Sequence, residues 1–198
     1  MTRHGETAWN REGRMQGWAP TALTDRGHEE ARTLGAHLAD AYDVDRLVAS
    51  DLARTRQTAT HVADALGLEP AFDDAWRERD FGTLQGLLRA EIRERGAAAA
   101  SARPEGGESF HDARDRVADA WSNLRGTLGT DETVVVVAHG GVIKLLVGHL
   151  RGWDVATTFS RVETGNCGVT TVAVDPDGDP TAGDELLGVD DREYFEEA

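Results

Sequence analysis

Three segments of the chain have the unbroken apolar character of buried strands. The strongest is residues 133–138, where Thr133 is followed by four valines and an alanine. A continuous run of β-branched residues suits a strand that is covered on both faces, as in a parallel sheet. Residues 44–50 and 169–174 are two shorter candidates.

Amphipathic helical patterns alternate with these strands. They cover residues 24–41, about 50–66, 110–128 and 140–150. Thr24 and Ser50 are the predicted N-caps of the first two helices, because a hydroxyl oxygen can accept a backbone N–H bond from the first turn. Strands that alternate with helices predict an α/β fold with a mostly parallel sheet.

The length of 198 residues suits one domain with its own core. We place this domain at residues 1–175. Residues 97–107 are rich in Ala, Pro and Gly and predict a loop. Residues 176–198 form an acidic C-terminal segment, which we expect to be partly strand and flexible at its end.

The chain is strongly acidic, with a formal net charge of −15, and Lys144 is its only lysine. Such a surface repels nucleic acids and anionic lipids, so we expect neither as a partner. A halophilic cytosol and the ordinary acidic bias of a GC-rich genome both remain open. No membrane span or signal peptide is readable, so we expect a cytoplasmic protein. The single Cys167 cannot form an internal disulfide and is expected to be a packed core residue.

The strongest candidate for chemistry is His139, which ends the valine strand and precedes Gly140 and Gly141. Ligands of open α/β sheets bind outside the carboxyl ends of the strands. Glycines allow a ligand to approach the backbone, and a helix N-terminus favours an anion. We therefore favour an anion site over a histidine that only packs in the core.

Three further blocks complete the pattern: Arg3-His4-Gly5, the segment 50–59 with Arg54, and the segment 76–82 with Glu78. Together with the His139 block, and in this order, they resemble the histidine phosphatase superfamily, also called phosphoglycerate mutase-like. The resemblance extends from Arg3 to about Val174. It implies a three-layer α/β/α sandwich around the mostly parallel sheet.

The resemblance also implies the residue roles. His4 would be the nucleophile that forms a phosphohistidine, and Glu78 the proton donor. His139 would bind the phosphoryl group as the third catalytic residue. Substrate binding would fall to Arg3, Asn10, Gln16, Gly17, Arg54 and Gly140. The expected partner is a phosphorylated small molecule, with no cofactor and no metal, because arginines and His139 supply the positive field.

Physical chemistry constrains the nucleophile. His4 must be neutral to attack, and the nearby charges of Arg3 and Arg54 should lower its pKa. We expect its second ring nitrogen to donate to a backbone carbonyl, which would fix the tautomer. Arg56 is a rival to Arg54, and Glu78 could be one more surface charge. Five other histidines lie in helical patterns without metal-ligand spacing: His28, His37, His61, His111 and His149.

The sequence departs from the family at its start. Members carry a hydrophobic strand directly before the Arg-His-Gly block, whereas only Met1 and Thr2 precede Arg3. The first strand therefore looks missing, which would expose two strand edges and leave His4 on a loose terminus. We hypothesise that the native protein is longer; an intact mass from the native cell that starts at Met1 would refute this.

The segment 97–107 is short, and Gly141 stands where cofactor-dependent mutases carry Asn. Residues 104–109 followed by a helix resemble the broad-specificity phosphatase branch. A phosphomonoester hydrolase is therefore the leading interpretation. The alternatives are a phosphoglycerate mutase and a non-catalytic phosphate-binding module. The particular phosphomonoester and the oligomeric state stay open.

Overall fold

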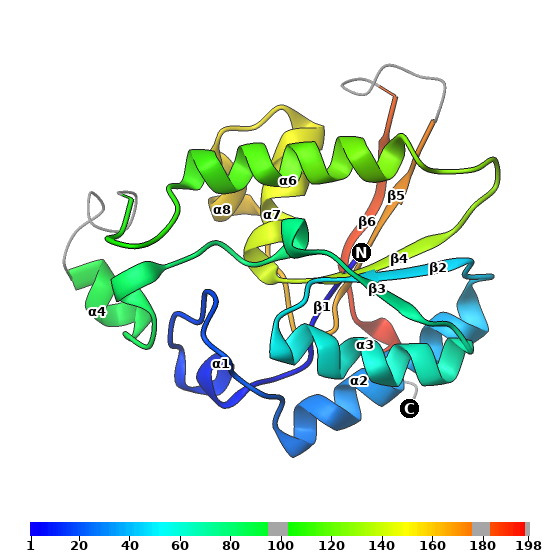
Figure 1. The fold of residues 1–198 in the computed structure, drawn as a ribbon, viewed down its shortest axis with the longest axis horizontal. Coiled ribbons are helices and arrows are strands. Elements are labelled where there is room, and N and C mark those ends of the chain that lie inside the picture. The colour runs from blue at the N-terminus through cyan, green and yellow to red at the C-terminus, as the bar shows by residue number, and fades with distance from the viewer. Residues whose placement is uncertain (95–102, 176–182, 197–198) are drawn as a thin grey trace.

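The computed structural model describes residues 1–94, 103–175 and 183–196. A six-stranded sheet lies between two layers of helices (Figure 1). Its strands, in spatial order, are β3 (Pro70–Phe72), β2 (Arg46–Ala49), β4 (Val134–Ala138), β1 (Thr2–Arg3), β5 (Val169–Ala173) and β6 (Glu185–Asp191). The first four pair in parallel, and β5 is antiparallel to β1 and β6. The predicted three-layer sandwich with a mostly parallel sheet is confirmed.

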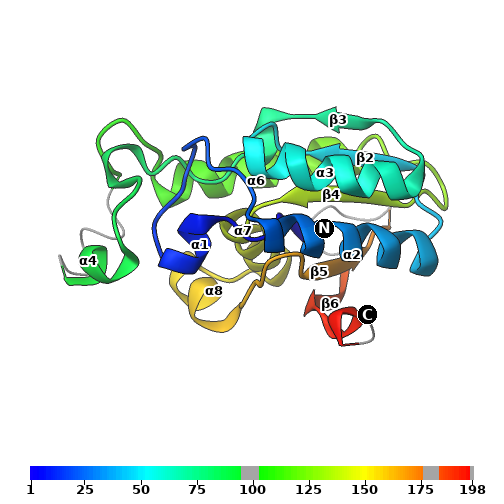
Figure 2. The same cartoon turned by 90° about the horizontal axis from the view of Figure 1, so that it is seen from below.

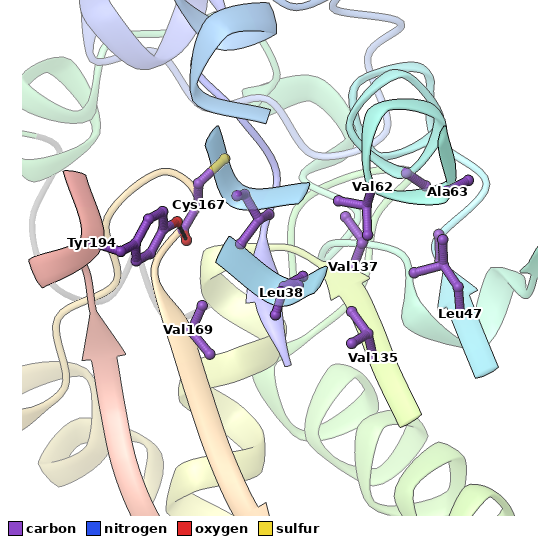
Figure 3. Packing of buried hydrophobic residues seen from close by; sticks show 12 residues of the cluster. Leu38, Leu47, Val62, Ala63, Val135, Val137, Cys167, Val169 and Tyr194 are labelled. Atoms are coloured by element: carbon purple, nitrogen blue, oxygen red, sulfur yellow. Dashed lines mark hydrogen bonds between the residues drawn. The ribbon is translucent and has the colours of Figure 1, made fainter. Parts of the chain in front are cut away.

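The side chains of the valine strand β4 are covered by helices on both faces of the sheet. Val135 and Val137 belong to a core cluster with residues of α2 (Asp25–Ala41) and α3 (Ala53–Leu66). Val136 and Ala138 belong to a second cluster, with residues of α6 (Phe110–Arg125) and α7 (Gly140–Arg151). Neighbouring side chains of a strand point to opposite faces, so an unbroken apolar run fits a central strand. Figure 3 shows the first cluster, and Figures 1 and 2 show its two helices on one side of the sheet.

The smaller elements connect or follow the main helices and strands. They are α1 (Ala8–Glu12), α4 (Arg89–Glu94), α8 (Val155–Arg161) and the 3-10 turns Asp74–Trp76, Gly82–Leu84 and Glu193–Phe195. Within the described chain, no helix is long and apolar enough to span a bilayer.

The two predicted helix caps have different outcomes. The hydroxyl oxygen of Thr24 accepts the N–H of Gly27 at 3.0 Å, so this cap is confirmed. The Ser50 cap is wrong, because α3 begins at Ala53 after Leu52, which makes no side-chain cap bond. The Ser50 hydroxyl instead lies 2.9 Å from Nε2 of His139. It also accepts the N–H of Leu52 at 3.4 Å, so the hydroxyl has a local and a tertiary partner.

The first strand is present in a shortened form. Thr2 lies opposite Val137 of β4 and Val169 of β5, and the N–H of His4 donates to the carbonyl of Ala138 at 3.1 Å. His4 is only 3% exposed. The expectation that His4 would lie on a loose terminus is wrong, because pairing on both sides holds even this two-residue strand in the sheet.

A cavity of about 440 Å³ lies beside Met1. Its walls include residues 134–136 of β4 and residues 169–173 of β5, with Leu38 and Trp121 from the helical layers. The amino terminus of Met1 is buried there and donates to the carbonyl of Thr170 at 2.6 Å. Burial lowers the pKa of this amino group from 8.0 to about 5.

The C-terminal segment contributes to the sheet through β6. Beyond it, Tyr194 is buried; its hydroxyl donates to the carbonyl of Cys167 at 2.6 Å, and its ring stacks on His37. Cys167 is fully buried, as expected of a packed residue. The end that we expect to be flexible begins at Asp190; within it, β6 ends at Asp191 and a 3-10 turn covers Glu193–Phe195, whereas residues 197–198 lie outside the described residues.

The buried amino terminus predicts a pH-dependent stability. The unfolded chain binds this proton up to about pH 8, but the folded chain binds it only below about pH 5. The free energy of unfolding should therefore rise from pH 5 to 8, by up to about 1.4 kcal/mol per pH unit from this group. Urea denaturation at several pH values measures the slope.

An extended variant isolates this contribution from that of the buried histidines. About five β-branched residues placed before Met1, a strand of ~16 Å, would fill the cavity and move the charged amine outwards. We expect this variant to be more stable than the parent near pH 6 and to show a shallower slope. Parallel slopes for the two proteins would contradict the assignment.

Candidate active site

The imidazoles of His4 and His139 lie together, although 134 residues of chain separate them. Their ring centres are 5.3 Å apart, and both side chains are almost fully buried. His4 follows β1 and His139 follows β4, and these strands are parallel neighbours. The carboxyl ends of parallel neighbours meet at one edge of a sheet, which is where α/β proteins bind ligands.

The hydrogen bonds of His4 define its tautomer. Nδ1 lies 2.7 Å from the carbonyl oxygen of Gly5, so Nδ1 carries the proton. Nε2 accepts a bond of 3.2 Å from Nε of Arg54, so it presents a lone pair. Burial, then the charges of Arg54 and Arg3, hold the pKa of His4 well below 6.5. The structure thus agrees with the expected neutral ring and backbone contact.

Arg54 is the arginine that reaches the site. It is fully buried near the start of α3, and its guanidinium also donates to the carbonyls of Gly17 at 2.7 Å and Ala19 at 3.3 Å. Burial lowers its pKa to about 10, while the Glu78 carboxylate acts in the opposite direction. Arg56 is exposed and lies over the ring of Phe72. The choice of Arg54 over Arg56 is therefore correct for the position of the side chain.

Two buried nitrogens beside His4 have no hydrogen-bond partner among the described residues. They are Nε of Arg3 and Nδ1 of His139. Another nitrogen of each side chain does have a partner. Nη1 of Arg3 donates to the carbonyl of Thr164 at 2.6 Å, and Nε2 of His139 contacts the hydroxyl of Ser50. An unpaired buried polar group costs about 1–3 kcal/mol. An oxyanion bound between these side chains would remove that cost.

Glu78 lies against the first turn of α7, next to His139. Its carboxylate accepts the N–H of Arg79 at 2.9 Å through Oε1 and the N–H of Gly141 at 3.0 Å through Oε2. A Cβ atom at position 141 would lie only 2.2 Å from Oε1. Glycine at position 141 is therefore a condition for this placement of Glu78.

The loop that carries Glu78 is held from outside the pocket. Arg116 of α6 donates to the carbonyls of Ala75 and Arg77, both at 2.8 Å, and forms an ion pair with Glu108 at 2.7 Å. The indole N–H of Trp18 donates to the carbonyl of Glu78 at 2.7 Å. These bonds fix the backbone, so the carboxylate keeps its orientation.

Asn10 is oriented by the acceptor side of its amide. Its Oδ1 accepts the N–H of Thr7 at 3.1 Å and Nδ2 of Asn166 at 3.2 Å. Asn166 also donates to the carbonyl of His4 at 2.9 Å. Because the oxygen is occupied, the amide nitrogen is the group that Asn10 can offer to a ligand.

Three further predicted residues, Gln16, Gly17 and Gly140, lie around the site and contact its other residues. Gln16 accepts bonds from the hydroxyls of Thr7 and Thr21, and no described bond joins it to either histidine. Gly17 provides a carbonyl to Arg54. Gly140 begins α7, where a Cβ would lie 2.8 Å from the hydroxyl of Thr164 and 3.5 Å from Arg3.

Sequence reasoning missed the residues that position the others, chiefly Ser50, Asn166 and Arg116. Ser50 follows strand β2, so the rule that selected His139 from the carboxyl end of a strand would also have found it. Asn166 and Arg116 carry no such signal. Their partners are backbone carbonyls and an amide that only the folded chain brings near.

The described residues contain no cluster of His, Cys, Asp and Glu side chains that could hold a metal ion. The positive charge next to His4 comes instead from Arg3 and Arg54.

Comparison with known proteins identifies the family. The model of the histidine phosphatase superfamily (branch 1) matches residues 1–182, and the chain belongs to this superfamily. A 2,3-bisphosphoglycerate-dependent phosphoglycerate mutase of Brucella melitensis is 34% identical in an alignment 168 residues long, which covers 77% of this chain and 80% of that protein.

Solved structures give the same fold. A mycobacterial glucosyl-3-phosphoglycerate phosphatase in complex with VO3 is 32% identical, with a TM-score of 0.77 over 87% of this chain and 90% of that chain. A protein described as mycobacterial hydrolase 1 is 31% identical, with a TM-score of 0.84 over 96% of each chain. The relatives thus include both phosphatases and a mutase.

Gly141→Ala tests the contact between Glu78 and α7. The new methyl group would push the carboxylate away from the helix, so we expect kcat for an alkyl phosphomonoester such as glycerol 3-phosphate, whose leaving alcohol needs a proton, to fall about 10- to 100-fold. Gly188→Ala is the control, because a Cβ there meets nothing within 4 Å. Full activity of Gly141→Ala would show that the position of Glu78 is unimportant.

Asn166→Asp tests the positioning of Asn10. A carboxylate would face Oδ1 of Asn10 and the carbonyl of His4, both acceptors, so we expect about a tenfold loss of kcat/KM. Asn123→Asp makes the same charge change at an exposed site on α6. Equal activities of the two variants would refute the positioning role.

Proposed function

We propose that this protein is a phosphomonoester hydrolase that acts through a phosphohistidine on His4. In the first step, the lone pair of Nε2 attacks phosphorus in line with the ester bond. A P–N bond forms and the P–O bond to the leaving alcohol breaks, while Glu78 gives its proton to that alcohol. Covalent catalysis of this kind divides one difficult displacement into two easier ones.

In the second step, water attacks the phosphohistidine from the side that the alcohol has left. The P–N bond breaks, the carboxylate of Glu78 takes the proton of the water, and phosphate leaves. Throughout both steps, Arg3, Arg54 and His139 donate to the phosphoryl oxygens, with Asn10 as a further donor. Such donors are worth roughly 3 kcal/mol each in a transition state.

The observation that carries this proposal is the arrangement around Nε2 of His4. A neutral, buried nucleophile lies beside two arginines, and the unpaired nitrogens of Arg3 and His139 adjoin it. Glu78 lies near enough to influence the pKa of both arginines. These side chains lie in one cluster, which supports the proposal that they act as nucleophile, oxyanion donors and acid in phosphoryl transfer.

The relatives support small phosphorylated metabolites as substrates. The named relatives act on phosphoglycerate or a glucosylated form of it. Phosphoglycerate mutase is the second candidate, because the curated relatives are mutases. Hydrolysis stays the leading proposal because Gly141 and the short segment at 97–107 resemble the phosphatase branch. Inorganic phosphate released from 3-phosphoglycerate supports a hydrolase; conversion to 2-phosphoglycerate without release supports a mutase.

His4→Ala tests the nucleophile directly. The parent enzyme is mixed with a ³²P-labelled phosphomonoester, and the reaction is stopped rapidly without acid. We expect label on His4 that is lost in acid and stable in alkali. We expect the variant to lose both the label and turnover, by at least about 10³-fold, while its circular dichroism stays that of the parent.

His28→Ala is the matched control, because it removes a histidine from α2 outside the pocket. Retained turnover of His4→Ala would remove His4 as nucleophile. Label that is stable in acid would point to an ester rather than a phosphohistidine.

A further inference from the structure

Trp18 is an exposed aromatic side chain that joins two segments of the candidate active site. It is 37% exposed and follows Gly17, whose carbonyl accepts a bond of 2.7 Å from the guanidinium of Arg54. The indole N–H of Trp18 donates to the carbonyl of Glu78, also at 2.7 Å. A Cβ atom at Gly17 would lie 3.0 Å from the backbone nitrogen of Phe81, so the two segments touch. The indole therefore lies on the side of the site that carries the proposed proton donor.

The indole is held in one orientation. The guanidinium of Arg77 lies over its ring, with Cζ 4.7 Å from the ring centre. Arg77 is itself fixed by Asp51, whose carboxylate accepts its Nε at 2.6 Å and its Nη2 at 2.5 Å. The backbone N–H of Trp18 donates to Oε1 of Gln85 at 2.5 Å. Contacts on one face, at one edge and at the backbone therefore position the ring, although solvent reaches more than a third of the residue.

The face of the ring opposite Arg77 is open to a ligand. Among the described residues, no second ring or cation stacks on Trp18. A single exposed apolar side chain is common on protein surfaces. A ring that is both exposed and fixed is a better binding surface, because little conformational entropy is lost when a flat group stacks on it.

We propose that the open face of Trp18 binds the leaving group, and that it selects phosphomonoesters whose alcohol carries a ring with a flat apolar face. Glu78 has to reach the ester oxygen in order to protonate it, so the leaving alcohol passes beside the segment to which the indole is bonded. An aromatic ring and the C–H face of a sugar ring both stack on an indole. The inference rests on the hydrolase proposed above and names the substrate class of that site.

Two matched substrate pairs test the proposal. The first pair is 2-phenylethyl phosphate and ethyl phosphate, and the second is glucose 6-phosphate and glycerol 3-phosphate. All four are esters of primary alcohols, so the leaving oxygens are similar and the ring is the main difference within each pair. The full chain should give a higher kcat/KM for the member with a ring in at least one pair, and the pair that shows it identifies the kind of ring.

Two variants of Trp18 separate stacking from the bond to Glu78. Trp18→Leu removes the ring, whereas Trp18→Phe keeps an aromatic face and loses the indole N–H. Trp18→Leu should abolish the preference, a change of about fivefold to tenfold that arises mainly through KM. Trp18→Phe should keep most of the preference, even where its kcat falls equally on both members of a pair. Variants that lower activity equally on both members and leave the preference unchanged would show that Trp18 only positions the segment of Glu78, which overturns the proposal.

Trp153→Leu is the matched control. The guanidinium of Arg161 lies over the ring of Trp153, with Cζ 5.2 Å from the ring centre, as Arg77 does for Trp18. Trp153 follows the C-cap of α7, at the opposite end of this helix from the site. The control should keep the preference of the parent, and thermal midpoints of all variants verify folding. A parent without any preference for a ring, or a control that loses it as Trp18→Leu does, overturns the proposal.

Failure of the proposed function gives a different result. A chain that hydrolyses none of the four substrates refutes the hydrolase. Calorimetric binding of the same four compounds then decides the role of Trp18 alone. Tighter binding of a compound with a ring than of its partner, lost in Trp18→Leu and kept in Trp153→Leu, supports the stacking surface, and equal binding within both pairs overturns it.

Discussion

The pairing of β1 with β4 is the constraint on which the site depends. Two residue pairs, Thr2 with Val137 and Arg3 with Ala138, set the position of His4 relative to His139. Side chains alternate between the faces of a strand, so a shift of one residue would turn Arg3 and His4 to the wrong sides. The bond from the N–H of His4 to the carbonyl of Ala138 extends this register to His4 itself.

The positive charge at the site acts over a short range, and its sign is opposite to that of the net charge of the whole chain. A protein with a net charge of −15 repels a phosphorylated substrate at long range. Burial of Arg3 and Arg54 compensates at short range, because their charges act through a medium that screens them less than water does. The same burial keeps His4 and His139 neutral. Two buried cations thus lie beside a neutral imidazole, as the proposed reaction requires.

The pocket is rigid because its supports come from several directions. Asn166 links Asn10 to the backbone of His4, Ser50 orients His139, and Arg116 holds the loop of Glu78. None of these three needs to touch a substrate. Preorganised donors avoid the cost of reorienting during the reaction, which is why such supporting bonds matter for catalysis.

The sequence by itself determined the sandwich, the central valine strand, and the roles expected of His4, Arg54, Glu78 and His139. The apolar pattern predicts the position of β4 because a strand that is buried on both faces needs apolar residues at every position. The sequence did not determine that the Ser50 hydroxyl would contact His139, or that a two-residue β1 would keep His4 buried. These outcomes depend on contacts between distant segments, whose energies appear only when the chain has folded and their partners are within reach.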